Sequence, residues 1–156
     1  MRVSDFGFDC KEIFVDTYIS IAEKFKNEKL TYFNKHLYNN MLNLMANADD
    51  YKYNVLLTPG LFANTAKIGS SQVTTAINNT QNRGDAIYVA DLVPFGSSVN
   101  DATTAANAKN TSYAASYWPW VQTIDPDSAQ LIWVPASTLV GGVYAYNDNV
   151  SEPWFA

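Results

Sequence analysis

Side chains that carry out covalent chemistry are scarce in this chain, which has a single cysteine, Cys10, and a single histidine, His36. One cysteine excludes an internal disulfide and a zinc site built on cysteine ligands. A catalytic histidine needs a nucleophile and an orienting carboxylate beside it, and the sequence nominates neither. His36 follows Lys35 in a helical pattern, so we interpret it as a surface or half-buried structural residue.

Positive charge and long apolar runs are scarce as well. The 10 basic residues stand against 15 acidic ones, which gives a formal net charge of -5. Nucleic-acid binding depends on clustered lysine and arginine, so we expect no direct nucleic-acid partner. No apolar run reaches the roughly 18 residues of a membrane-spanning helix, and the N-terminus lacks the apolar core of a signal peptide. We therefore expect synthesis in the cytoplasm and no membrane partner.

Motifs for phosphate and metal binding are missing too. The sequence has neither G-x-x-x-x-G-K-[ST] nor G-x-G-x-x-G, and Gly69-Ser70-Ser71 is better explained as a helix cap than as an anion site. The acidic pairs Asp49-Asp50 and Asp125/Asp127 are typical of turns, because calcium needs three or more converging oxygens. Arg83-Gly84-Asp85 matches a cell-adhesion tripeptide, but we interpret it as a helix end followed by a strand. We expect no catalytic, cofactor-binding or metal site.

Aromatic residues, by contrast, are abundant, with ten Tyr, eight Phe and four Trp among 156 residues. Together with 47% hydrophobic residues, they indicate a packed globular chain long enough for one domain with a buried core. Large aromatic side chains dominate both cores and protein interfaces, and we assign about two-thirds of them to the core and one-third to interfaces. Trp154 and Phe155 are the strongest candidates for an interface.

Apolar residues recur at helical spacing in some segments and run continuously in others. This pattern predicts helices over about 11–27, 34–46, 70–82, 98–108 and from 135 onward, with caps at Asn34, Ser70 or Ser71, and Ser97 or Ser98. It predicts strands over 53–58, ended by Pro59-Gly60, and over 86–93. Strands separated by helices of this length are typical of an α/β fold. We expect a mostly parallel sheet with helices on both faces plus a C-terminal β-hairpin.

The hairpin is predicted from residues 111–134. Residues 111–120 form a strand rich in aromatics, in which Pro119 marks an edge or a bulge. A turn at Asp125-Pro126-Asp127-Ser128 leads to the return strand over 131–134. Pro135 suits the first position of the last helix, in which Gly141 and Gly142 indicate a bend or a close backbone contact.

These segments also carry a resemblance to a known family. The similar segments are Tyr53–Gly60, Arg83–Asp91, Tyr113–Trp120, Asp125–Asp127, Trp133–Ser137 and Gly141–Ala145. They resemble, in order and spacing, the central block of the contractile phage tail sheath protein. The resemblance covers about residues 49–156 and implies a core of subtilisin-like topology.

The resemblance implies a structural role without enzymatic activity. A sheath subunit belongs to the virion tail, is assembled in the host cytoplasm and drives viral genome ejection by contraction. The implied partners are other sheath subunits in stacked six-membered rings, the tail tube protein, the baseplate and the tail terminator. No cofactor is implied.

The resemblance also implies the domain organisation. Residues 1–48 are expected to form an N-terminal helical lead-in, and residues 49–156 a tail-sheath-like α/β core that is incomplete at its C-terminus. Sheath subunits are much longer, so we expect this chain to be a fragment. The alternative hypothesis is a small α/β hydrolase-like or ligand-binding domain, with a pocket at the carboxyl ends of the strands near Pro59-Gly60 and Asp91.

Overall fold

The computed structural model of the chain describes residues 28–64 and 69–151. The predicted helix over 11–27, as well as Trp154 and Phe155, lie outside the described residues. The described elements, in chain order, are α2 (Glu28–Met45), β1 (Val55–Phe62), α3 (Ser70–Arg83), β2 (Ile87–Asp91), α4 (Val99–Asn107), β3 (Ala114–Ser116), β4 (Val121–Ile124), β5 (Leu131–Val134) and α5 (Ala136–Val150).

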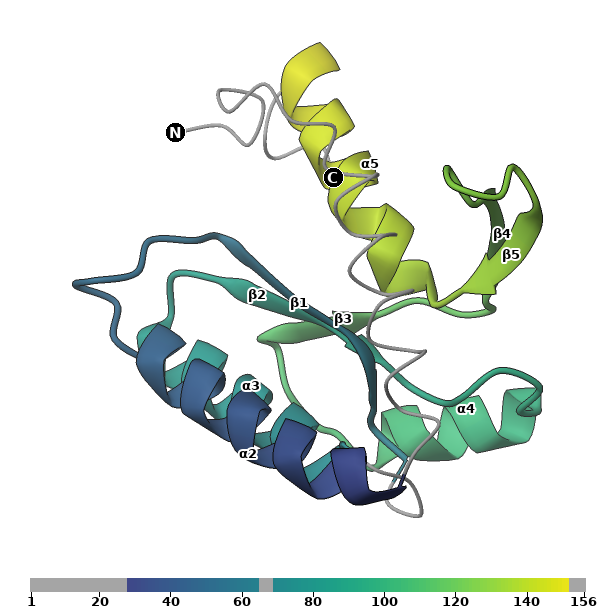
Figure 1. Ribbon diagram of the computed structural model, residues 1–156. Helices are drawn as coiled ribbons and strands as arrows, with labels where there is room; N and C mark the ends of the chain where they lie inside the picture. Colours follow the sequence, from purple (N-terminus) through teal and green to yellow (C-terminus); the bar gives the residue numbers. More distant parts are fainter. Residues whose placement is uncertain (1–27, 65–68, 152–156) are drawn as a thin grey trace.

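Strands β1, β2 and β3 form a parallel sheet in that order. Helices α2 and α3 cover one face of the sheet and α5 stands on the other (Figure 1). Strands β4 and β5 pair antiparallel as a separate hairpin directly before α5. The predicted fold class is therefore confirmed: α/β, with a mostly parallel sheet, helices on both faces and a hairpin in the C-terminal part.

The main core lies between the sheet and the α2/α3 layer. Leu42 on α2, Val73 and Ala76 on α3, and Leu56 and Tyr88 on the sheet are all buried there. Met41 and Met45, both on α2, pack against this cluster as flexible apolar side chains. Burial of one apolar stripe on each helix explains why both helices lie flat on the sheet.

Local signals placed several helix ends correctly. Gly84 ends α3 in the left-handed conformation, with a φ of 72°, and its N–H donates to the Thr80 carbonyl. Ser98 caps α4, and its hydroxyl accepts a hydrogen bond from the Asp101 N–H. The predicted cap of α3 was wrong by one residue, because Gly69 occupies the N-cap position instead of Ser70 or Ser71.

The predicted start of α2 at Asn34 was also wrong. The helix already includes Glu28, six residues before Asn34. Residues 28–33 contain neither glycine nor proline, so nothing in them ends the helix before it reaches Asn34. Asn34 is therefore an interior helical residue.

Strand β1 does not end at Pro59-Gly60, which corrects the prediction. The strand runs on to Phe62, and its register with β2 shifts between Leu57 and Phe62. Proline lacks an N–H and Gly60 has a φ of 85°, which together produce an irregularity inside the strand. The bulged strand carries Leu61 and Ala63 back into the core.

The predicted aromatic strand over 111–120 was wrong in length and in partner. Only Ala114–Ser116, β3, form a strand there, and they join the parallel sheet beside β2. The hairpin partner of β5 is β4, which begins after Trp120. Residues 117–120, which include Pro119, belong to neither strand and connect the sheet to the hairpin. None of the helices within the described ranges has both the length and the apolar character that a membrane span requires.

Candidate functional site

A buried polar cluster lies where the parallel strands end. Asp91, the last residue of β2, is 4% exposed, and its Oδ2 atom accepts a hydrogen bond from the Ser137 hydroxyl at 2.9 Å. The same oxygen accepts from the Gly60 N–H in the β1 bulge at 3.3 Å. Ser137 also donates its backbone N–H to this carboxyl group. The cluster therefore joins β1, β2 and the first turn of α5.

Burial changes the acid–base character of this cluster. It raises the pKa of Asp91 to about 7, although the hydrogen bonds from Ser137 and Gly60 act in the opposite direction. Nearby, the Tyr88 hydroxyl shares a 2.6 Å hydrogen bond with the Thr58 hydroxyl, and burial raises the pKa of Tyr88 as well. The site is thus a buried, hydrogen-bonded group of polar side chains.

The cluster brings together two members of a hydrolase triad but not the third. Asp91 and Ser137 meet at the position where the alternative hypothesis placed a pocket. His36 lies exposed on α2, and α2 covers the face of the sheet opposite to α5 (Figure 1). Ser137 is itself only 1% exposed, so a substrate in solvent does not reach its hydroxyl. The geometry provides neither the base nor the access that acyl transfer needs.

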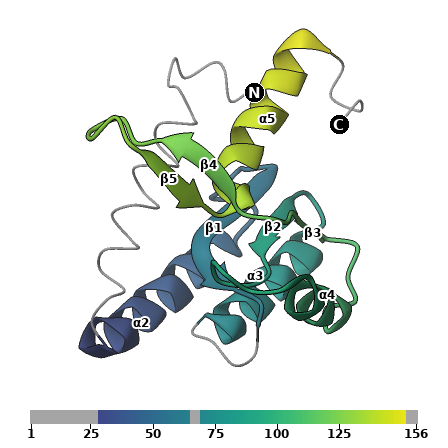
Figure 2. The same ribbon diagram turned by 90° about the vertical axis from the view of Figure 1, so that its right-hand side faces the viewer.

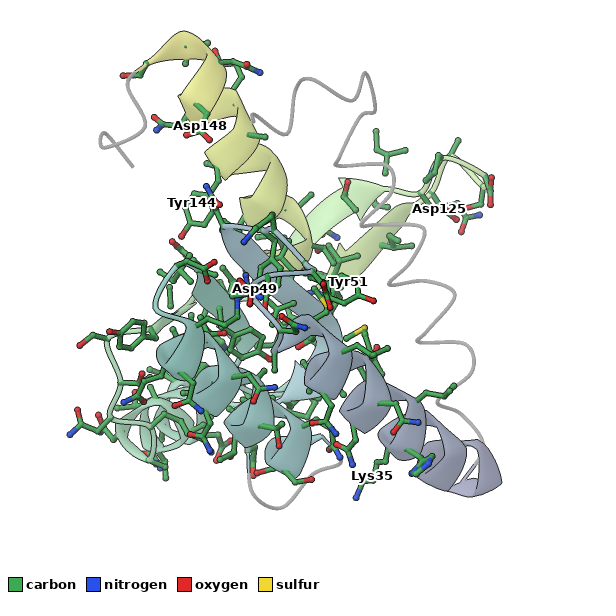
Figure 3. The ribbon with its side chains drawn as sticks, turned by 90° about the vertical axis from the view of Figure 1, so that its left-hand side faces the viewer. Lys35, Asp49, Tyr51, Asp125, Tyr144 and Asp148 are labelled. Atoms are coloured by element: carbon green, nitrogen blue, oxygen red, sulfur yellow. The ribbon has the colours of Figure 1, made fainter. Side chains whose placement is uncertain are left out.

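The acidic pairs do not converge either. In Figure 3, Asp125 lies at the tip of the hairpin, far from Asp49 in the loop that follows α2. Within residues 28–64 and 69–151, no three His, Cys, Asp or Glu side chains are grouped closely enough to hold a metal ion. Asp125 accepts hydrogen bonds from the Asp127 N–H and the Ser128 hydroxyl, as expected of a turn.

The cell-adhesion tripeptide has a structural role. The Arg83 side chain is 1% exposed and forms an ion pair with Asp85 at 2.9 Å. It also donates to the backbone carbonyls of Met45 and Tyr51, both at 2.9 Å, and stacks over the ring of Tyr53 at 4.1 Å. The guanidinium group thus binds the end of α2 and the following loop to α3, and it is not available to a receptor.

Exposed apolar side chains lie together on one face of the hairpin. In the β4–β5 ladder, Ile124 lies opposite Leu131 and Gln122 lies opposite Trp133, so these side chains share one face. Ile124, Leu131 and Trp133 are 62%, 64% and 47% exposed. Phe95, 57% exposed, lies against Trp133 with ring centroids 5.4 Å apart. We call Phe95, Ile124, Leu131 and Trp133 the hairpin face.

The hairpin is fixed to the sheet by Trp120. Its indole N–H donates to the Val93 carbonyl at 3.0 Å, and its ring stacks on Phe62 of β1 at 6.1 Å. Phe95 contacts the same ring edge-on at 5.5 Å. Figure 2 shows the hairpin projecting beside α5. The hairpin face is thus presented by a firmly attached element and does not belong to a loose loop.

Helix α5 carries a second exposed apolar surface. Val143, Tyr146 and Val150 follow one another at helical spacing and are 60%, 67% and 61% exposed. The Tyr144 and Tyr117 hydroxyls share a hydrogen bond, which ties α5 to the chain between β3 and β4.

Among the aromatic side chains that the structure describes, from residue 35 onward, Tyr88 alone is fully buried. Sequence reasoning pointed to Asp91 as a strand end but missed Ser137, and it did not identify the hairpin face. The two-residue spacing of Gln122 and Ile124, and of Leu131 and Trp133, was the available signal for that face, because residues two apart on a strand share a face.

The chain matches no protein-family model, and no curated protein matches it.

Proposed function

We propose that this chain is a structural subunit, or part of one, in the contractile tail sheath of a phage or a phage-like injection machine. The proposal joins the sequence resemblance over residues 49–156 to the surface properties of the folded chain. In this role the protein assembles around a tail tube, and its function lies in contacts with neighbouring subunits. No covalent chemistry is required.

The hairpin face is the observation that carries the proposal. An isolated two-stranded hairpin is marginally stable in water. Exposed apolar side chains gathered in one patch are typical of protein interaction sites. Four large apolar side chains lie on this face, and no charged side chain interrupts them in the β4–β5 ladder. A neighbouring subunit packed on this face would bury it.

The α/β core supports the same proposal. A sheath subunit must survive contraction as a rigid body while its contacts with neighbours are exchanged. Burial of α2 and α3 on the sheet, together with the Arg83 and Trp120 contacts, provides such a body. The free energy of contraction then comes from the difference between two sets of intersubunit contacts, which is the only source available to a switching assembly without chemistry.

Electron microscopy tests the proposal directly. The product of the complete reading frame would be purified and imaged in negative stain, alone and together with the product of the adjacent gene for a small tube protein. We expect tubes or stacked rings with six subunits per ring. A monodisperse protein without tubes or rings in both preparations would contradict the proposal.

The contact between Asp91 and Ser137 is the one observation that favours the alternative, a small α/β hydrolase. A fluorophosphonate probe separates the two functions, because it labels activated serines. The structural proposal expects no labelling of Ser137, whose hydroxyl is buried and hydrogen-bonded to a carboxyl group. Labelling that disappears in the Ser137→Ala variant would favour the hydrolase.

A further inference from the structure

Helix α5 lacks a local cap and receives one from a distant strand. Pro135 occupies its N-cap position and provides no side-chain acceptor for the first turn. Asp91, 46 residues away in sequence, accepts hydrogen bonds from the hydroxyl and the N–H of Ser137 instead. A carboxyl group at a helix N-terminus satisfies N–H groups that have no acceptor within the helix. The start of α5 is thus held by β2.

The same carboxyl group holds the bulge of β1. Its Oδ2 atom accepts from the Gly60 N–H, and the backbone carbonyl of Asp91 accepts from the Ala63 N–H at 2.9 Å. Asp91 therefore connects both sides of the bulge to β2 and connects the bulge to α5. The hairpin precedes α5 directly, so the chain leaves β5 at the turn of α5 that Asp91 holds.

We propose that Asp91 is a proton-sensitive latch, in which the protonation state of its carboxyl group sets how firmly the first turn of α5 is held against the parallel sheet. The latch goes beyond the proposed function and does not depend on it. It would act in any assembly that uses α5 or the hairpin as a contact.

The surroundings of Asp91 give the direction of the effect. Neither β1 nor the first turn of α5 contains an ionisable side chain, so no cation from these elements offsets the buried charge. On β2, burial raises the pKa of Tyr88, and the negative charge of Asp91 raises it further. Burial raises the pKa of Asp91 to about 7 in the closed latch. Opening exposes the carboxyl group to water, where its pKa returns to about 3.9.

The closed latch consequently binds its proton more tightly than the open one. Protonation of Asp91 stabilises the closed arrangement fully when the pH is below the pKa of the open state. This stabilisation is lost as the pH rises through the pKa of the closed state. The latch is therefore tightest in mild acid and weakest above neutral pH.

Native-state hydrogen exchange on the wild-type chain tests this inference. Exchange would be measured at pH 5 and pH 8, corrected for intrinsic rates, at amides in the first turn of α5 and in the buried part of α3. We expect the opening constant in α5 to rise roughly 10- to 100-fold between the two values, as linkage requires, and that in α3 to stay constant. An unchanged constant in α5, or an equal rise in both helices, would overturn the latch.

Two further measurements keep the test specific. The Asp91→Asn variant retains a carbonyl acceptor but cannot ionise, so we expect α5 opening to become independent of pH. Asp127→Asn removes a carboxylate from the exposed turn and should leave the wild-type dependence intact. If Asp91→Asn does not fold, a carbon-13 titration of the Asp91 carboxyl group in the wild-type chain still tests the latch. A midpoint near 7 supports the latch and one near 4, the value of a solvated aspartate, overturns it.

Discussion

Gly69 and Gly96 both hold a positive φ, 104° and 82°, but their surroundings differ. A Cβ atom at Gly69 would lie 3.0 Å from a Leu61 methyl carbon and 3.2 Å from the Leu61 Cα, whereas nothing lies within 4 Å at Gly96. Leu61 belongs to the bulged part of β1 and cannot move freely, because it is buried in the core. A side chain at Gly96 would therefore add backbone strain alone, whereas one at Gly69 would add both strain and a close contact with Leu61.

We expect Gly96→Ala to lower the free energy of unfolding by roughly 1–2 kcal/mol through strain alone. Gly69→Ala should cost about 1–3 kcal/mol more, because overpacking of Leu61 adds to the same strain. Urea denaturation followed by circular dichroism measures both values. Equal losses in the two variants would show that the Leu61 contact is not close.

Arg83 is the second residue whose role the structure defines. Replacing it with alanine removes the ion pair to Asp85 and the hydrogen bonds to the Met45 and Tyr51 carbonyls. We expect Arg83→Ala to lower the free energy of unfolding by roughly 2–3 kcal/mol, because backbone acceptors lose their donors. Lys109→Ala, which removes one hydrogen bond to the Thr74 hydroxyl at the surface, should change it by about 0.5 kcal/mol or less. A similar effect of both variants in urea denaturation would contradict this role of Arg83.

At the scale of elements, Trp120 attaches the hairpin to the α/β core. Trp120→Phe keeps ring contacts with Phe62 and Phe95 but loses the hydrogen bond to Val93. We expect it to lower the free energy of unfolding by about 1 kcal/mol, and Trp120→Ala by roughly 3 kcal/mol. Hydrogen exchange in β4 and β5 should rise more than in β2. Uniform loss of protection across all three strands would show that the hairpin is not attached through this residue.

Elements whose boundaries depend on neighbouring residues were predictable from the sequence. Gly84 ends α3 because the left-handed conformation is local, and Ser98 starts α4 because its hydroxyl reaches an N–H only three residues away. The antiparallel hairpin followed from the turn at Asp125 between two short strands. The alternation of helices with apolar strands likewise indicated the α/β class.

Elements that depend on distant contacts were not predictable in the same way. Pro59-Gly60 reads as a strand end, but the Gly60 N–H finds an acceptor in Asp91, 31 residues away, and the strand continues. The contact between Asp91 and Ser137 spans 46 residues. The residue types at both positions are common, so no local pattern marks them as partners.

At the scale of the whole molecule, the two faces of the sheet differ in what they present to solvent. Helices α2 and α3 close one face, while α5 and the hairpin stand on the other (Figures 1 and 2). The hairpin face and the exposed stripe of Val143, Tyr146 and Val150 both belong to this second side. A molecule that buries both surfaces must contact neighbours there, and two unlike surfaces suit a head-to-tail contact that repeats into rings or tubes.

The assembly contact is tested most directly by charge substitutions in the hairpin face. Leu131→Lys places an ammonium group at a site that the proposal buries between subunits, which costs several kcal/mol without a partner. Leu44→Lys makes the same change on α2, where the leucine is 60% exposed and lies away from the hairpin. Both variants should keep the wild-type circular dichroism spectrum, because each side chain already faces solvent.

The decisive measurement is the yield of tubes and rings in negative-stain images of the complete product carrying each substitution. We predict that Leu131→Lys abolishes them and that Leu44→Lys leaves them at the wild-type level. Assembly that persists at the wild-type level in Leu131→Lys would contradict the assignment of the hairpin face as a contact between subunits.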